Sequence, residues 1–167
     1  KRKQAGEALR EHQELLAKAF RTSPHPIGIT ELATGRCIEV NDACLEAFGF
    51  RREEVIGNTT FLLGIWPKLE DRARVIERLK AGQSMRNMEF ALKTKSGALR
   101  YFLASADLAE LNGVLCVVTV ANDITDRKLT ELGLRDRDAT LALALDAAYA
   151  IAFTWDVADD VVRRLHS

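Results

Sequence analysis

The sequence predicts an α+β fold in which a five-stranded antiparallel sheet carries helices on one face and amphipathic helices flank it at both ends. Three observations support this prediction. Segments in the middle of the chain alternate apolar and polar residues, which is typical of half-buried strands. The pair Asn112-Gly113 suits a tight hairpin turn between the last two strands. The segment Val114–Lys128 begins as an apolar, β-branched strand and passes without Gly or Pro into a helical pattern.

An N-terminal helix is predicted over residues 1–20. Its apolar stripe consists of residues spaced alternately by four and three, namely Ala5, Leu9, His12, Leu16 and Ala19. The stripe has two interpretations, which can hold together: it covers the domain's own sheet, or it forms a parallel coiled coil that makes the chain a homodimer. The segment Ser23–Pro26 ends the helix, because proline lacks a backbone donor and disfavours helical angles in the residue before it.

Strands and short helices then alternate. Residues 27–32 and 37–40 are predicted to form a first hairpin. Residues 41–63 change to short helical pieces, the first of which Asn41 or Asp42 can cap. Because glycines interrupt these pieces, we expect them to form the wall of a pocket and not one long helix.

A longer amphipathic helix is predicted from Glu70 to Ala81, closed by Gly82. Its expected apolar side consists of Leu69, Ala73, Ile76 and Leu79. Strands follow at 88–92 and 99–108. After Lys128 a second amphipathic helix is predicted, with Leu129, Leu132, Ala139 and Leu143 on one side.

Composition excludes several function classes. The chain has 24 basic and 24 acidic residues, so no overall field favours nucleic acid or an anionic membrane. No apolar run approaches the roughly 20 residues of a membrane helix, and the segment is expected to be cytoplasmic. The three cysteines, Cys37, Cys44 and Cys116, have neither disulfide nor zinc-site spacing and are expected to be buried thiols. No catalytic or metal-binding motif is present, so we expect no enzymatic activity in this segment.

Several motifs, in order, resemble those of PAS domains. Val114–Lys128 resembles the C-terminal PAC motif of that family, in which the last strand ends in Asp-Ile-Thr followed by an acidic residue, Arg and Lys. Ile38–Cys44 resembles the family's second strand and first short helix. Phe48–Phe50 and Lys95–Gly97 resemble its glycine-aromatic turn and the turn between its third and fourth strands. The resemblance covers about Phe20 to Lys128, and the chain is identified as a PAS domain of the sensory-box type.

The resemblance implies a segment of a bacterial multi-PAS signalling protein. We expect a linker helix over 1–20, the PAS domain over 21–127, an outgoing helix over 128–148, and the truncated start of a second PAS-like unit over 149–167. In that last part, Ala150–Asp156 resembles a first PAS strand. The partners implied are neighbouring PAS units and a C-terminal effector, a sensor histidine kinase of a two-component system or a cyclic-dinucleotide enzyme.

The positions that bind haem or flavin in members of the PAS family have other residue types in this chain. Haem-binding members use a histidine on the long helix, and residues 71–81 contain none. Light-sensing flavin members use a cysteine thiol where this chain has Thr60, and Leu92, Phe102 and Ala121 stand where polar side chains grip the flavin. Haem and photoactive flavin are therefore not expected. A redox flavin site with other contacts is the alternative function.

The inner side of the sheet has two interpretations: a filled core, or a cavity for a small, largely apolar ligand. The residues expected to line it are Ile29, Phe61, Trp66, Met88, Phe90, Leu92, Phe102, Ala104 and Thr119. Trp66 is the best candidate for a ligand contact, because it lies at the break between helices.

The strand-to-helix joint is the expected output of the domain. Asp123 and Thr125 can cap the first turn of the outgoing helix, and Arg127 can pair with charges nearby. The two interpretations left open are a signal relay and a plain helix cap.

Overall fold

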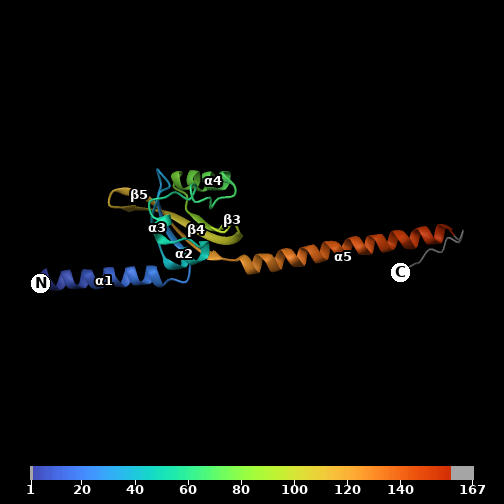
Figure 1. Cartoon of the computed structure of the whole chain (residues 1–167), viewed down its shortest axis with the longest axis horizontal. Coiled ribbons are helices and arrows are strands. Elements are labelled where there is room, and N and C mark those ends of the chain that lie inside the picture. The colour runs from blue at the N-terminus through green and yellow to red at the C-terminus, as the bar shows by residue number, and fades with distance from the viewer. Residues whose placement is uncertain (1, 159–167) are drawn as a thin grey trace. The chain divides into compact units, whose positions relative to one another are not determined.

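The computed structural model describes residues 2–158 (Figure 1). The chain divides into two units, residues 1–125 and residues 126–167, which are described separately. The first unit contains α1 (Arg2–Thr22) and a sheet with its helices, and the second contains nearly all of α5 (Thr125–Ala158). None of the helices in the described range is long and apolar enough to cross a membrane.

The predicted five-stranded antiparallel sheet is confirmed, in the order β2-β1-β5-β4-β3. Its strands are β1 (Ile27–Glu31), β2 (Cys37–Val40), β3 (Met85–Lys93), β4 (Leu99–Leu111) and β5 (Val114–Asp123). β5 lies in the centre, between β1 and β4, and all neighbouring strands are antiparallel. The last strand of the chain is therefore held on both sides.

The turn between β4 and β5 has the predicted form. Asn112 and Gly113 have φ values of 50° and 78°, and the flanking Leu111 and Val114 are paired. Positive φ at both central residues is the geometry of a type I′ turn, whose twist matches that of the two strands. The Asn-Gly pair therefore fixes the register of the longest hairpin.

Three short helices cover the inner face of the sheet: α2 (Asp42–Phe48), α3 (Arg52–Val55) and α4 (Leu69–Lys80). Their buried residues pack against the residues of the sheet that face the same side. The predicted N-cap of α2 is confirmed, since the Asn41 side chain accepts a hydrogen bond from the Cys44 N–H at 3.0 Å. The fold class predicted from the sequence is thus confirmed.

The apolar side of α4 differs from the prediction. Val75 and Leu79 are buried and Ile76 is half-buried, whereas Ala73 is exposed and Leu69 is 49% exposed. The buried face is rotated by part of a turn, because a short helix with several alternating apolar residues fits more than one phase of the 3.6-residue period. Gly82 ends the helix as expected, with φ 75°.

α1 leaves its apolar stripe uncovered. Residues 6–19 are exposed, and Leu9 and Leu16 are 59% and 58% exposed. The interpretation that this stripe covers the domain's own sheet is therefore wrong. Among residues 6–22, it is the end of α1 that is tied to the domain, where the Phe20 carbonyl accepts a hydrogen bond from Asn41.

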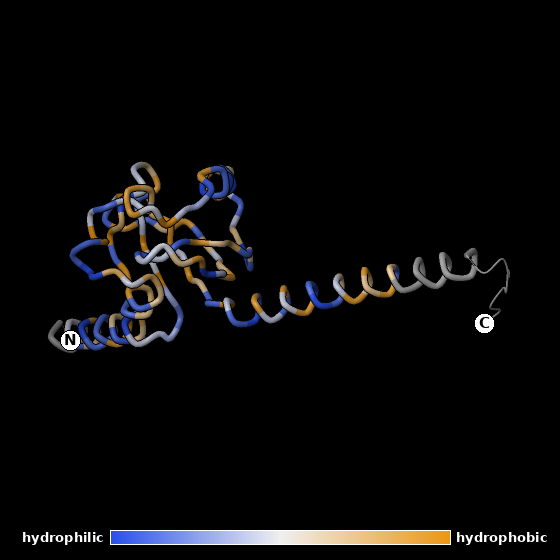
Figure 2. Tube along the Cα trace, turned by 45° about the vertical axis from the view of Figure 1, so that its right-hand side comes forward, coloured by the Kyte–Doolittle hydropathy of each residue, from blue (hydrophilic) through white to orange (hydrophobic). Residues whose placement is uncertain are grey.

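The strand predicted for Ala150–Asp156 is also wrong, because α5 continues to Ala158. Along residues 126–147 of α5, hydrophobic and hydrophilic stretches are interspersed (Figure 2). After Gly133 its sequence is rich in alanine and has no Gly or Pro that would end a helix, and a lone strand has no neighbour to pair with. Residues 159–167 lie outside the described range, and the second PAS-like unit stays a prediction.

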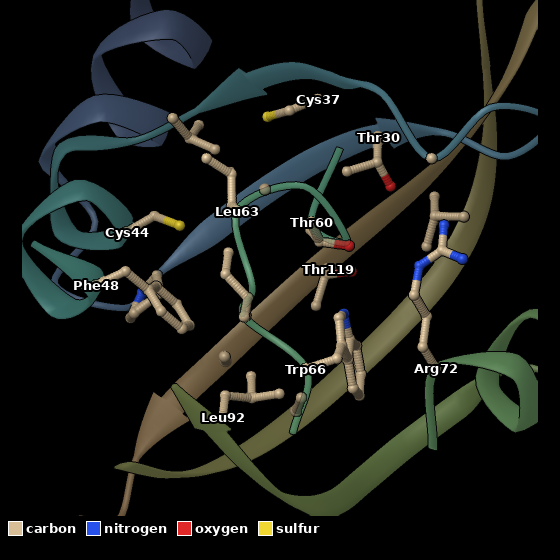
Figure 3. A pocket seen from close by; sticks show the side chains of 18 of the residues that line it. Thr30, Cys37, Cys44, Phe48, Thr60, Leu63, Trp66, Arg72, Leu92 and Thr119 are labelled. Carbon is tan, nitrogen blue, oxygen red and sulfur yellow. The ribbon is translucent and has the colours of Figure 1, made fainter. Parts of the chain in front are cut away.

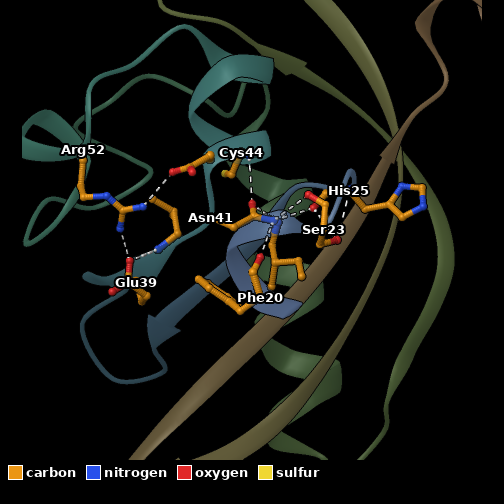
Figure 4. Close-up of polar contacts among 10 residues, drawn as sticks. Phe20, Ser23, His25, Glu39, Asn41, Cys44 and Arg52 are labelled. Atoms are coloured by element: carbon orange, nitrogen blue, oxygen red, sulfur yellow. Dashed lines mark hydrogen bonds and ion pairs between the residues drawn. The ribbon is translucent and has the colours of Figure 1, made fainter. Parts of the chain in front are cut away.

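Asn41 joins three parts of the first unit (Figure 4). Its side chain is fully buried; Oδ1 accepts from the Ile27 N–H at 2.9 Å as well as from Cys44. Nδ2 lies within hydrogen-bond distance of the carbonyls of Phe20, Ser23 and His25, at 3.2, 3.4 and 2.8 Å. One amide therefore holds the end of α1, the start of β1 and the start of α2.

An Asn41→Asp variant tests this role. The carboxylate keeps the acceptor that caps α2, but it places an oxygen against three carbonyls that need a donor. We expect the free energy of unfolding to fall by about 2 to 4 kcal/mol, because each buried polar group left unpaired costs about 1 to 3 kcal/mol. Urea denaturation followed by circular dichroism measures the change.

Asp42→Ala is the matched control, because Asp42 is the next residue and its side chain is 64% exposed. We expect this control to cost less than about 1 kcal/mol. Equal losses for the two variants would contradict the importance of the Asn41 donor.

Candidate functional site

A cavity of about 180 Å³ lies on the inner side of the sheet (Figure 3). Small residues on adjacent strands leave the space: Gly28 on β1, Ala104 on β4 and Ala121 on β5. Gly28 is paired with Thr119, and Ala104 with Ala121, so the small side chains meet at the middle of the sheet. α4 and the loop before it, which includes Trp66, contribute the opposite wall.

Aromatic pairs form part of that wall and of the core behind it. The Trp66 ring meets Phe90 edge-on, with centroids 5.5 Å apart and planes at 79°. Phe48 stacks on Phe102 with centroids 4.9 Å apart. Such pairs contribute about 0.5 to 1.5 kcal/mol each beyond the area they bury. The cavity therefore has a stiff apolar wall that does not depend on a ligand for its shape.

Five of the residues predicted to line a pocket do so: Trp66, Phe90, Leu92, Ala104 and Thr119. They come from the loop before α4 and from the three consecutive strands β3, β4 and β5. The alternation of strand residues correctly indicated their side of the sheet.

Two other predicted residues lie elsewhere because of their local backbone. Gly28 and Thr30 of β1 line the cavity, so Ile29 between them belongs to the opposite face. Phe61 lies in a turn and is 56% exposed. Neither residue lines the cavity.

Phe102 and Met88 were also predicted to line it and do not. Phe102 is fully buried against Phe48, so it belongs to the filled core behind the wall. Met88 is partly buried against the core cluster around Val75. A register shift between Met85 and Met88, with φ 48° at Asn87, brings Met85 to the cavity in its place.

Arg72, Cys37 and Cys44 line the cavity and were not predicted to do so. Arg72 precedes Val75 and Ile76 by three and four residues, so it shares their side of α4. Arg72 was not predicted because the buried side of α4 was expected on a different set of residues. With Val75 and Ile76 on the buried side, the spacing of three and four residues would have indicated Arg72. The cysteines were expected to be buried but were not connected with a pocket.

The two thiols of the wall are hard to ionise. Burial raises the pKa of Cys37 to about 11, with a further contribution from the negative charge of Glu39. Burial likewise raises the pKa of Cys44 to about 12, and the neighbouring Cys37 adds to it. Both side chains are therefore neutral near pH 7, which keeps this part of the cavity apolar.

These thiols predict an alkaline loss of stability. The pKa of each thiol is raised above its ordinary value of 9.0 in the folded protein. Their contribution to the free energy of unfolding is therefore complete below pH 9 and declines as the pH rises toward 11. We expect a loss of about 1.4 kcal/mol per pH unit for each thiol in that window. Chemical denaturation at pH 8, 9 and 10.5 measures it. A Cys44→Ala variant should lose less stability than the wild type over this range, and an equal loss would contradict the assignment.

The joint between β5 and α5 is fixed to the beginning of β4. The Asp123 carboxylate accepts hydrogen bonds from the Thr125 N–H at 2.9 Å and pairs with Arg100 at 3.0 Å. The Thr125 hydroxyl accepts from the Tyr101 N–H at 3.0 Å, and the Ile124 N–H donates to the Tyr101 carbonyl at 2.8 Å. Asp123 thus caps the first turn as predicted; Arg127 lies on α5 in the second unit.

The sequence matches the family model described as the PAS fold over residues 14–124. The chain belongs to the PAS family. No curated protein matches it. Within the described range, no three His, Cys, Asp or Glu side chains are placed to hold a metal ion.

Solved PAS domains are similar in fold. The PAS domain of an HTR-like protein from Haloarcula marismortui is 21% identical, with a TM-score of 0.58, over 73% of this chain and 99% of that one. A domain of a sensory box sensor histidine kinase/response regulator from Geobacter sulfurreducens is 23% identical, with a TM-score of 0.57, over 69% and 96%. The PAS domain of a LuxR-family transcriptional regulator from Burkholderia thailandensis, solved with ethanol, is 16% identical, with a TM-score of 0.51, over 65% and 96%.

Proposed function

We propose that this PAS domain is a sensory and relay module of a bacterial signal-transduction protein, in which a small, largely apolar ligand in the cavity changes the joint between β5 and α5. One observation carries the proposal. β5 lines the cavity with Val117, Thr119 and Ala121 and ends two residues later at Asp123. The strand that meets the ligand is therefore the strand that leads into the outgoing helix.

The distance favours coupling through this strand. Successive residues of a strand rise by about 3.3 Å, so Ala121 is about 7 Å from Asp123 along β5. Alternation places both on the same side of the sheet. If the wall around Ala121 has two arrangements, a ligand that binds one of them more tightly increases its population. The conformation of the joint that goes with this arrangement is then populated more.

The cavity itself also supports a ligand. About 180 Å³ beside mostly apolar side chains is a size that a small apolar molecule fills, since a cavity of about 150 Å³ holds benzene. The Burkholderia thailandensis domain in complex with ethanol is a PAS domain with a small organic molecule. The effector, a sensor histidine kinase or a cyclic-dinucleotide enzyme, belongs to other parts of the protein, and this segment is non-catalytic.

Native mass spectrometry and an absorption spectrum of the purified chain test ligand binding. We expect a bound mass of a small organic molecule and no visible absorption band. A visible band would instead indicate the redox flavin alternative. A chain without any bound mass, and without stabilisation by any apolar probe, would contradict the sensory role of the cavity.

The relay is tested by Asp123→Ala and Thr125→Ala in a protein that includes its effector domain. Both side chains lie where the central strand β5 ends, and they bond to each other and to the start of β4, so we expect the domain to stay folded, with a loss of about 1 to 2 kcal/mol. The effector activity should no longer respond to ligand. Asn122→Ala is the control, because Asn122 is exposed on the same strand. A normal response in both joint variants would contradict the relay.

We also propose that a second copy of the chain covers the α1 stripe, giving a homodimer. Leu9, His12, Leu16 and Ala19 follow the a and d spacing of a coiled coil, and both leucines are more than half exposed. A monomer would leave this apolar stripe in water.

A double variant, Leu9→Lys with Leu16→Lys, should be monomeric, because charges replace the apolar seam. Size-exclusion chromatography with light scattering measures the mass. Leu15→Lys is the matched control, since Leu15 is 63% exposed but off the stripe. A wild type that is monomeric at high micromolar concentration would overturn the dimer.

A further inference from the structure

We infer that the ligand of the cavity is an anionic amphiphile: a monocarboxylate whose apolar part fills the cavity and whose carboxylate pairs with Arg72. This inference rests on the proposed function, since it specifies the ligand of the same cavity. It follows from one cation and three hydroxyl groups in a mostly apolar lining that also includes Glu31.

Arg72 is an arginine without a protein partner. It lines the cavity from the first turn of α4, and among residues 2–158 no carboxylate forms an ion pair with it and no group accepts its hydrogen bonds. The next arginine of α4 behaves differently, because Arg74 pairs with Asp71. A half-buried guanidinium has five N–H donors in a planar fork that matches a carboxylate.

Gly35 allows the guanidinium to lie at this end of the cavity. A Cβ added at Gly35 would overlap the Arg72 guanidinium, and Gly35 has φ 70° in the turn after β1. The missing side chain lets Arg72 pack directly against the turn. Arg72 is therefore held against the Gly35 turn, at the wall of the cavity (Figure 3).

Three threonine side chains line the same cavity: Thr30 from β1, Thr60 from the loop and Thr119 from β5 (Figure 3). In the described part of the chain, none of these hydroxyls has a side-chain hydrogen-bond partner. Each can donate to an anionic oxygen, and such charge-assisted bonds are about twice as strong as neutral ones.

Glu31 is the acidic residue of the lining, and its negative charge opposes the binding of an anion. Its carboxylate accepts a hydrogen bond from the Thr34 hydroxyl at 2.6 Å and forms no ion pair with Arg72. The guanidinium therefore keeps its donors for a ligand. The Arg72 guanidinium favours a ligand with a carboxylate at its end of the cavity, and the wall around Trp66 favours an apolar part. Together they favour an amphiphile.

The size and polarity of the cavity limit the ligand further. A cavity of about 150 Å³ accommodates benzene, so about 180 Å³ suits an apolar part of roughly six to eight carbons. A second charge at the far end would be buried among apolar side chains without a partner, which is strongly unfavourable. A medium-chain monocarboxylate fits, and a dicarboxylate does not.

Octanoate and 1-octanol test the inference, because they share a chain length and differ in the charged head. Isothermal titration calorimetry at pH 7.5 uses the full chain in its wild-type, Arg72→Gln and Arg74→Gln forms. We expect the wild type to bind octanoate at least tenfold more tightly than octanol. Arg72→Gln should lose at least tenfold in octanoate affinity and keep its octanol affinity, whereas Arg74→Gln should behave as the wild type.

The outcomes separate this inference from the proposed function. Equal binding of octanoate and octanol by the wild type, or unchanged octanoate binding by Arg72→Gln, would overturn the anionic ligand while the apolar cavity remained a binding site. No binding of either compound, with another bound mass in native mass spectrometry, would overturn the monocarboxylate alone. No binding and no bound mass would overturn both proposals.

Discussion

The buried amide of Asn41 is the constraint on which the rest of the first unit depends. It has no exposed surface, and its partners belong to α1, the following loop, β1 and α2. Because an amide has both donors and acceptors, no apolar residue can replace it without leaving backbone groups unpaired. By fixing where β1 and α2 begin, Asn41 also sets the separation of two cavity walls, represented by Gly28 and Cys44.

The cavity and the joint depend on the central position of β5. β1 and β4 hold this strand along its length, and its inward residues include the small Ala121. The stacked pair Phe48 and Phe102 fills the neighbouring core, so the open space is confined to the region beside Trp66. The open space is therefore bounded on one side by β5, the strand whose end begins the joint.

The arginines of the domain lie in two different surroundings. Several arginines of the domain, such as Arg52, Arg86 and Arg100, form ion pairs near the surface. These exposed pairs contribute little to stability. Arg72 instead lies against an apolar cavity among unpaired threonine hydroxyls, in a position where desolvation strengthens its interaction with an anion. This contrast is the reason for assigning a charged head group to the ligand.

The sequence by itself determined the fold class, the Asn112-Gly113 turn, a cap at Asn41 or Asp42 and the strand alternation that correctly places Phe90, Leu92, Ala104 and Thr119, because these depend on local backbone preference and period. The tertiary structure alone decided the phase of β1 at Ile29, the bulge at Asn87, the exposure of Phe61 and the filled core at Phe102. It also placed Arg72 in the cavity and extended α5 beyond the predicted strand. The physical reason is that period fixes which residues share a face, whereas packing between distant elements decides which face is buried and where space remains.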